Sequence, residues 1–213
     1  MPRSGTGRIC RVSKHENVPK EPCPCKLCKD TSSPEVSWGE IFVVTATHVI
    51  YDQDETADAS CLLNYDSQDE KGSRLDDANF IESEITDDKC WLRFFTHDLQ
   101  LTDEIVAKVC RYDQLCEVLH AKYKKEDTTL QGENRFAVIV SHPHGSYKMV
   151  SVGQWTQREL MDKYHTQYVY NAMTCPGTSG ATVYTLSMPG WFYVHTHSGA
   201  KPDGGFSGYG FEH

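Results

Sequence analysis

The chain has 213 residues, 38% of them hydrophobic, and a formal net charge of −9, so it is long and apolar enough for one two-barrel domain or two small domains. An acidic chain without a stripe of Lys and Arg residues argues against nucleic acid and anionic membrane surfaces as partners. No apolar run approaches the roughly 18 residues of a membrane-spanning helix, and the first residues lack the apolar core of a signal peptide.

The first half of the chain has the pattern of short β-strands with one polar, cysteine-rich insertion. Strands are expected where apolar or β-branched residues gather between turn residues. The expected strands are residues 4–12, 38–49, 61–65, 80–85 and 90–95. The insertion between the first two covers about residues 13–37, and residues 87–89 form the turn between the last two. These elements predict an N-terminal β-barrel over residues 1–101.

The insertion contains three cysteines, Cys23, Cys25 and Cys28, in the pattern C-x-C-x-x-C. Three thiolates at this spacing can bind one structural Zn²⁺ ion, with Cys10 or His15 as the candidate fourth ligand. The alternative is that they are free or partly oxidised surface cysteines. The chain has nine cysteines in all. Without a secretion signal, an odd number favours reduced thiols and a cytoplasmic location.

A long helix is expected to link the two halves over residues 102–130. Apolar residues recur there at the spacing of one helix face. They are Ile105, Val109, Tyr112, Leu115, Cys116, Leu119 and Tyr123. Thr102, followed by Asp103 and Glu104, is the expected N-terminal cap.

The second half again has the pattern of short strands and predicts a C-terminal β-barrel over residues 131–213. The expected strands are residues 136–140, 149–155, 168–173, 181–186 and 191–197, the last two joined at Met188-Pro189-Gly190. Many short strands with one linking helix indicate an all-β class, and we expect two six-stranded antiparallel β-barrels with a linker helix.

A serine lies between glycines in Gly177-Thr178-Ser179-Gly180. Gly177 has no side chain to obstruct a reacting carbonyl, and Gly180 allows a sharp turn after the serine. The N–H groups of Gly177 and Ser179 can therefore form an oxyanion hole for acyl transfer. Taken alone, the motif is equally consistent with an ordinary Gly/Ser turn.

Two further motifs precede the serine: Thr45-Ala46-Thr47-His48 ends a strand, and Asp98 lies between apolar residues. With the serine motif, they resemble the chymotrypsin-like serine peptidases over nearly the whole chain. The resemblance implies that His48 is the general base, that Asp98 orients it and that Ser179 is the nucleophile. Asp98 is preferred to the aspartates at 76, 77, 87 and 88 because its apolar neighbours suit a buried carboxylate.

The resemblance also implies a substrate pocket. Ser198 and Gly199 are expected to run beside the substrate backbone, with Ser198 also contacting the triad aspartate. His197 and Thr174 are expected to line the pocket for the residue before the cut. An imidazole N–H and a hydroxyl suit the side-chain oxygen of Glu or Gln.

We therefore expect a serine endopeptidase that acts on polypeptides and requires no cofactor for catalysis. Two alternatives stay open. The chain could be a catalytically silent, peptidase-like binding module, or a self-processing domain of a larger protein.

Overall fold

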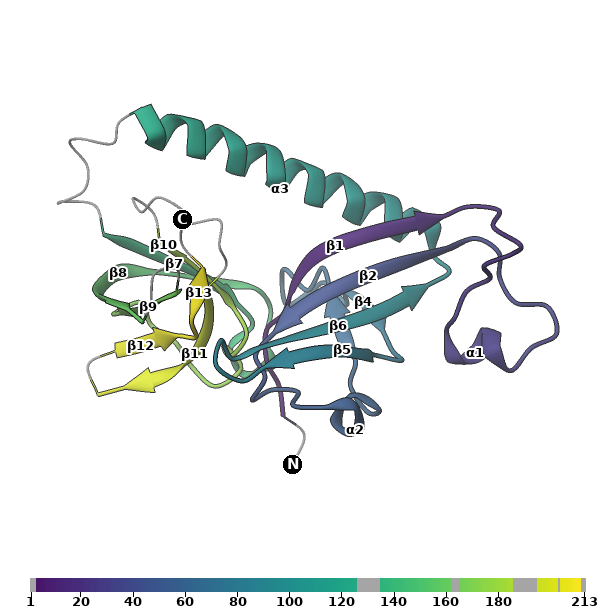
Figure 1. Ribbon diagram of the computed structural model, residues 1–213, viewed down its shortest axis with the longest axis horizontal. Coiled ribbons are helices and arrows are strands. Elements are labelled where there is room, and N and C mark those ends of the chain that lie inside the picture. The colour runs from purple at the N-terminus through teal and green to yellow at the C-terminus, as the bar shows by residue number, and fades with distance from the viewer. Residues whose placement is uncertain (1–2, 126–134, 162–164, 186–194, 203, 212–213) are drawn as a thin grey trace.

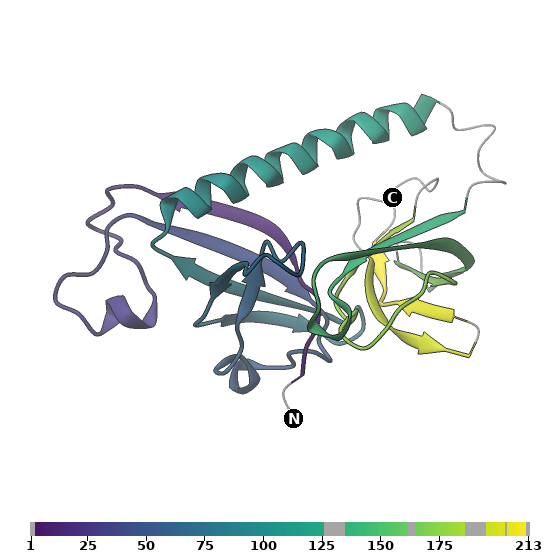
Figure 2. The same ribbon diagram turned by 180° about the vertical axis from the view of Figure 1, so that it is seen from behind.

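A computed structural model describes residues 3–125, 135–161, 165–185, 195–202 and 204–211 of the chain. It places a β-sheet and a β-barrel side by side, with one long helix running along both of them (Figures 1 and 2). The cysteine-rich insertion lies at the end of the sheet that is farther from the barrel (Figure 1). In the described ranges, no helix combines the length and apolar character needed to cross a lipid bilayer.

The N-terminal half contains a four-stranded antiparallel sheet in the order β1-β2-β6-β5. Its strands are β1 (Arg8–His15), β2 (Trp38–Thr45), β5 (Asn79–Glu84) and β6 (Lys89–Thr96). The central strands β2 and β6 are largely buried, as their apolar runs predict. They supply Ile41, Val43, Leu92 and Phe94 to the core of this half.

A separate two-stranded ladder, β3 (Cys61–Leu63) with β4 (Ser73–Leu75), packs on this core through Leu63 and Leu75. Each of these strands has only three residues, and the connection between them is polar. They therefore do not join the four-stranded sheet in the described part of the chain, and the predicted N-terminal barrel does not close.

The C-terminal half does form a closed six-stranded antiparallel barrel. Its strands are β7 (Phe136–Ser141), β8 (Met149–Leu160), β9 (His165–Tyr170), β10 (Thr182–Thr185), β11 (His195–Lys201) and β12 (Gly204–Ser207). Pairing of β12 with β9 closes the ring, and β13 (Gly210–Phe211) adds to β9 outside it. The prediction of two six-stranded barrels is thus correct for one half only.

The long helix α3 (Leu99–Lys125) begins three residues earlier than its sequence pattern predicts. Asp98 Oδ1 accepts a hydrogen bond from the N–H of Leu101 at 2.9 Å, which is the bond of an N-cap residue. Thr102, the predicted cap, is fully buried inside the first turns. The end of the predicted helix at residues 126–130 lies outside the described residues, as does the predicted hairpin turn at residues 188–190.

Three short helical segments complete the fold. They are α1 (Lys26–Lys29) within the insertion, α2 (Gln53–Thr56) after the second strand, and a 3₁₀ turn, η1 (Pro143–Gly145), after β7. The insertion between β1 and β2 otherwise has no regular structure in the described chain. Its cysteines are buried in a small cluster with Trp38 and Phe95, away from the main core.

Candidate active site

The imidazole of His48 is held by a carboxylate that the sequence pattern did not select. Asp88 Oδ2 lies 2.8 Å from His48 Nδ1, and Asp88 Oδ1 accepts the backbone N–H of His48 at 3.1 Å. The strand register explains this pairing, because Thr45 at the end of β2 pairs with Cys90 near the start of β6. Continued past these residues, an antiparallel pair brings the His48 turn opposite the Asp88 turn.

The Asp88 turn is fixed from both halves of the molecule. Ser198, on β11 of the barrel, donates its hydroxyl to Asp88 Oδ2. The buried ammonium of Lys89 donates to the carbonyl of Tyr209 at 3.0 Å, and Thr47 donates its hydroxyl to the carbonyl of Lys89 at 2.8 Å. The turn is therefore held by groups on three separate segments, and Ser198 also orients the carboxylate itself.

The environment of Asp88 keeps its carboxyl ionised. Burial favours the neutral acid, but hydrogen bonds from the His48 ring, the Ser198 hydroxyl and the His48 N–H outweigh it and lower the pKa of Asp88. An ionised carboxylate on Nδ1 fixes the tautomer with a proton on Nδ1 and leaves Nε2 to accept one. His48 can therefore act as a general base.

Asp98 does not contact the His48 ring, which hydrogen-bonds to Asp88 instead. The prediction that Asp98 orients His48 is wrong. Asp98 lies at the opposite end of β6, where it is exposed and caps α3. The eight residues of β6 separate the two aspartates by about 26 Å at about 3.3 Å per residue. The apolar residues around Asp98 belong to a strand end and a helix start rather than to a buried acid site.

The serine motif forms a tight turn in which Gly177 has a φ of 95°. The N–H of Thr178 donates to the carbonyl of Cys175 at 3.0 Å, so Pro176 and Gly177 are the central residues of a type II turn. The carbonyl of Pro176 accepts the N–H of His144 at 2.6 Å. Because C=O and N–H point in opposite directions in a trans peptide, the N–H of Gly177 points away from this contact.

The geometry leaves two amides for an oxyanion hole. Within the part of the chain that the structure describes, the N–H groups of Gly177 and Ser179 donate no hydrogen bond. Ser179 itself is half-buried, whereas Gly177 and Thr178 are buried. Two unpaired backbone donors beside a serine hydroxyl are thus available to an acceptor such as an oxyanion.

The serine turn packs against the turn that carries His48. A Cβ atom on Gly180 would come within 2.3 Å of Thr45 Oγ1 and 2.8 Å of Ala46 N, so only glycine permits this approach. A Cβ on Gly5 would meet both the Val49 side chain at 2.7 Å and the carbonyl of Ser179 at 3.1 Å. In the described chain, the ring of His48 hydrogen-bonds to Asp88 and not to Ser179.

The predicted pocket residue His197 lies beside the serine turn. Its carbonyl accepts the N–H of Gly180 at 3.0 Å, and its N–H donates to the carbonyl of Ala181 at 2.7 Å. The Tyr170 hydroxyl lies 2.6 Å from His197 Nδ1. Burial, with a smaller contribution from the nearby charge of His48, lowers the pKa of His197 to about 4, so the imidazole is neutral at neutral pH.

The other predicted pocket residues flank this histidine. Thr174 is half-buried just ahead of the serine turn. The pairing of β11 with β12 shifts register between His197 and Gly199, so the strand is irregular next to Ser198. A Cβ on Gly199 would press against the ring of Phe206 at 3.0 Å, so a larger residue here would have to displace that ring.

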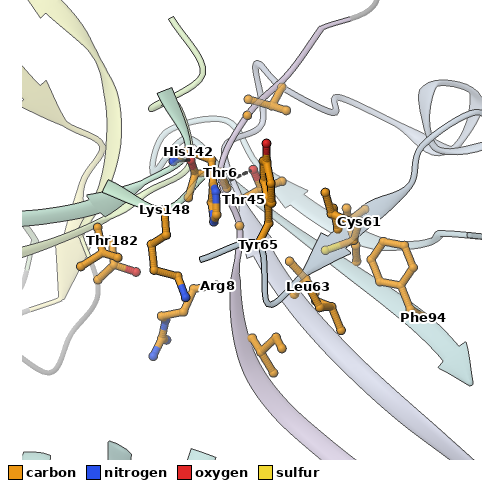
Figure 3. A pocket seen from close by; sticks show the side chains of 18 of the residues that line it. Thr6, Arg8, Thr45, Cys61, Leu63, Tyr65, Phe94, His142, Lys148 and Thr182 are labelled. Atoms are coloured by element: carbon orange, nitrogen blue, oxygen red, sulfur yellow. Dashed lines mark hydrogen bonds between the residues drawn. The ribbon is translucent and has the colours of Figure 1, made fainter. Parts of the chain in front are cut away.

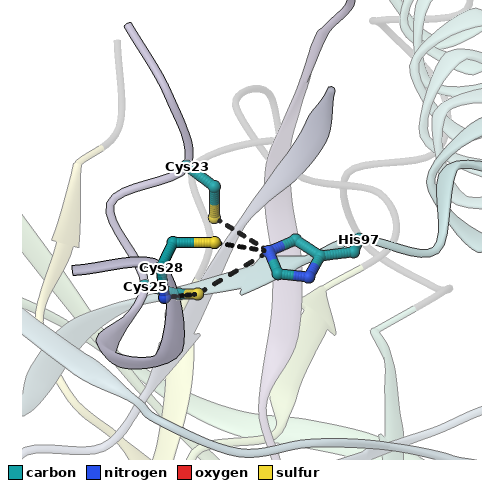
Figure 4. Close-up of side chains that lie close together, drawn as sticks. All are labelled: Cys23, Cys25, Cys28 and His97. Atoms are coloured by element: carbon teal, nitrogen blue, oxygen red, sulfur yellow. Dashed lines mark hydrogen bonds between the residues drawn. The ribbon is translucent and has the colours of Figure 1, made fainter. Parts of the chain in front are cut away.

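A second cluster of reactive side chains lies in the insertion. The Sγ atoms of Cys23, Cys28 and Cys25 lie 3.2, 3.4 and 3.6 Å from His97 Nε2 (Figure 4). The four ligand atoms all lie within 4.8 Å of one another, and such a Cys₃His set could hold a metal ion such as zinc.

The two candidate fourth ligands lie elsewhere. Cys10 Sγ contacts the carbonyl of Phe42 at 3.5 Å, and the His15 ring stacks on Trp38 with centroids 3.8 Å apart. Their places on β1 keep them out of the cluster, and the prediction of either as a ligand is wrong. The alternative of free or partly oxidised surface cysteines is wrong about their position, because all three are buried, although none of them forms a disulfide.

An open cavity of about 1010 Å³ lies between the two halves, where α3 bridges them. Figure 3 shows Arg8, Tyr65, His142 and Lys148 around it, so its wall mixes apolar and basic groups. The residues that line it include neither His48, Asp88 nor Ser179. The candidate active site is therefore separate from this cavity.

Comparison with known proteins gives a likeness of fold. A scan against models of protein families finds no match, and neither does a search of curated proteins. Among solved structures, the chain is similar to the HtrA-type protease AlgW with a tripeptide (14% identity, TM-score 0.41, 81% of this chain and 50% of that chain). It is also similar to AlgW with a decapeptide (14% identity, TM-score 0.44, 99% and 60%). The chain thus spans between half and two thirds of the length of these proteases.

Sequence reasoning missed Asp88, His97 and Tyr170. Asp88 is one of the four aspartates that the sequence analysis ranks below Asp98, because the pairing of β2 with β6 that brings its turn beside His48 is not visible in the sequence. Nothing in the local sequence marks His97 as a partner of cysteines about seventy residues earlier. Nothing local marks Tyr170, whose hydroxyl reaches His197 only across the barrel.

Proposed function

We propose that this protein is a serine endopeptidase in which Ser179, His48 and Asp88 form the catalytic triad. The observation that carries the proposal is the Asp88–His48 pair, 2.8 Å apart, beside a glycine-flanked serine turn with two free amides. A histidine with a purely structural role would need only one hydrogen-bond partner for its ring. Here Asp88 also accepts the backbone N–H of His48, the Ser198 hydroxyl donates to Asp88, and amides that are unpaired in the described chain lie in the neighbouring turn.

The roles follow from the chemistry of each group. His48 Nε2 takes the proton of the Ser179 hydroxyl as this oxygen attacks the substrate carbonyl, and later returns it to the leaving amine. Asp88 stabilises the imidazolium that forms, and the N–H groups of Gly177 and Ser179 bind the oxyanion. The reaction draws all its groups from the chain itself and requires no cofactor.

The pocket favours a polar, uncharged residue before the scissile bond. With Nδ1 of His197 engaged by Tyr170, Nε2 is the nitrogen left for substrate. A neutral imidazole N–H matches the amide oxygen of Gln, whereas the negative charge of Glu would gain no ion pair from an uncharged imidazole. We therefore expect Gln to be preferred, with Glu second and Arg, Lys or Leu disfavoured.

A fluorophosphonate probe tests the proposal directly, because it reacts only with an activated serine. We expect covalent labelling of the wild-type chain and none of Ser179→Ala or His48→Ala. Ser141→Ala serves as the matched control, since Ser141 is a buried serine on β7 outside the site. Absence of labelling in a folded wild-type chain would contradict the proposal.

A silent, peptide-binding module is the second candidate, because no hydrogen bond joins Ser179 to His48 in the described chain. In uncomplexed enzymes this bond is often long and tightens with substrate, so we favour the peptidase. A folded chain that binds Gln-containing peptides but is neither labelled nor able to cut them would establish the binding module. Cleavage of a separate polypeptide would exclude a domain that processes only its parent chain.

A further inference from the structure

We propose that Cys23, Cys25, Cys28 and His97 bind one structural Zn²⁺ ion that fastens the cysteine-rich insertion to the junction between β6 and α3. The site is distinct from the proposed catalytic centre, and neither proposal depends on the other.

The distances fit a tetrahedral ion. With Zn–S of about 2.3 Å and Zn–N of about 2.0 Å, the nitrogen and each sulfur of a tetrahedral site lie about 3.5 Å apart. The three observed separations from His97 Nε2 are 3.2, 3.4 and 3.6 Å. In Figure 4 the three sulfur atoms converge on this nitrogen from different directions.

Hydrogen bonding alone does not account for this convergence. A neutral imidazole nitrogen has a single lone pair or a single N–H, so it can make one good hydrogen bond in its plane. Three sulfur atoms gathered around one such nitrogen leave at least two contacts that gain nothing from hydrogen bonding. A cation at their centre would stabilise all four.

Backbone amides already point at two of the sulfurs. Cys25 is the N-cap of α1, where its Sγ accepts the N–H of Cys28 at 3.4 Å. The Sγ of Cys28 accepts the N–H of Glu35, also at 3.4 Å. Donors of this kind stabilise negative charge on sulfur and hold metal-ligating thiolates in place.

Apart from a few hydrogen bonds such as that from the N–H of Val18 to the carbonyl of Val36 at 2.9 Å, the insertion has little regular structure or core of its own. From residue 16 to residue 37 it contains one four-residue helix, and its buried cluster consists of the three cysteines with Trp38 and Phe95. A connection this long without regular structure needs another source of order. Metal binding supplies it in small units that lack a sufficient core.

The position of the site indicates a structural role. Four protein ligands fill a tetrahedral zinc site and leave no position open for substrate or water. His97 follows the end of β6, whereas Asp88 precedes its start, so the ion would lie about 26 Å from the His48–Asp88 pair at about 3.3 Å per residue. Its loss should disorder the insertion without removing any catalytic group.

Metal analysis of the purified, reduced chain tests the site. We expect one zinc per chain by mass spectrometry, and its loss in Cys25→Ser and in His97→Ala. Cys10→Ser and His15→Gln are the matched controls, because these residues are near in sequence but outside the cluster, and both should keep the zinc. Hydrogen exchange in residues 16–37 of the wild-type chain should rise sharply on chelation.

A second measurement covers the case in which the ligand variants misfold. Wild-type chain stripped of metal and loaded with Co²⁺ should show the visible absorption of a tetrahedral, thiolate-ligated ion. A folded wild-type chain that holds neither Zn²⁺ nor Co²⁺ after loading would overturn the proposal. So would zinc that survives both ligand substitutions.

Discussion

Two aspartates at opposite ends of one strand illustrate how position decides the role of a residue. Asp98 caps α3 through Leu101, and Asp88 orients His48. Both are short acids next to a strand, and their neighbours in sequence favour the wrong one, because apolar residues surround Asp98 and polar residues surround Asp88. What distinguishes them is which end of β2 each faces, since His48 follows only one of those ends.

At the same scale, His197 should make the stability of the protein depend on pH. Its pKa falls from 6.5 in the unfolded chain to about 4 in the folded one. Between these values the unfolded chain binds a proton that the folded chain excludes, so the free energy of unfolding falls as the pH drops through this window. The loss attributable to His197 should reach about 2–3 kcal/mol near pH 4.

Urea unfolding of the wild-type chain and His197→Gln, compared at neutral pH and at about pH 4.5, measures this contribution. All other ionisable groups are the same in both proteins, so the difference between their changes in unfolding free energy with pH isolates His197. We expect the free energy of unfolding to change less between the two pH values in the variant than in the wild type. Equal changes in both proteins would show that the imidazole is not buried in its neutral form.

At the scale of the element, the serine turn depends on a backbone conformation that only glycine adopts without strain. Gly177→Ala would place a Cβ within 2.7 Å of the His144 N and 2.8 Å of the His142 carbonyl, neither of which can rotate away. We expect a loss of about 2–3 kcal/mol of stability together with reduced labelling of Ser179.

Gly145→Ala is the matched control for this prediction. Gly145 has a comparable φ of 67°, but a Cβ there would meet no atom closer than 4.0 Å. It should cost about 1 kcal/mol and leave labelling unchanged. Thermal unfolding and probe labelling should therefore show a larger loss of stability and of labelling in Gly177→Ala than in Gly145→Ala. Equal effects in both variants would mean that the contacts of Gly177 are unimportant.

The sequence predicts some of the elements and candidate site residues but not others. Apolar runs predict the central strands, and short motifs mark His48, Ser179 and the three cysteines as candidate site residues. The sequence did not reveal that β3 and β4 would be too short to close a barrel. It also did not reveal His97 as the partner of the cysteines, because that contact joins the insertion to a strand end some seventy residues later. Local sequence patterns predict individual helices and strands, whereas contacts between distant segments depend on strand register and packing.

At the scale of the whole molecule, the two halves meet through buried polar contacts rather than through one shared core. Thr6 donates its hydroxyl to the carbonyl of Gly177 at 2.8 Å and accepts the N–H of His142 at 2.9 Å. It thereby ties the first segment of the chain to two turns of the barrel. The Asp88 turn makes a similar link through Ser198 and Tyr209.

Thr6→Val tests this arrangement, because valine has nearly the same shape but removes both hydrogen bonds. It would leave the partly buried N–H of His142 and the buried carbonyl of Gly177 without this partner, so we expect a loss of about 2–4 kcal/mol and weaker labelling of Ser179. Thr102→Val is the control: Thr102 is equally buried, but its hydroxyl donates only to the Asp98 carbonyl, which also accepts the N–H of Thr102. A smaller loss for Thr6→Val than for Thr102→Val would contradict the account.

The comparison of Asp88→Asn with Asp98→Asn tests the central claim most directly. The measurement is kcat for cleavage of a Gln-containing peptide. Asn stabilises the wrong tautomer of His48 but is as good a helix cap as Asp. We predict that Asp88→Asn lowers kcat by roughly 10³–10⁴-fold with the fold retained, and that Asp98→Asn leaves it unchanged. The reverse result, or equal activity in both variants, would contradict the assignment of the triad.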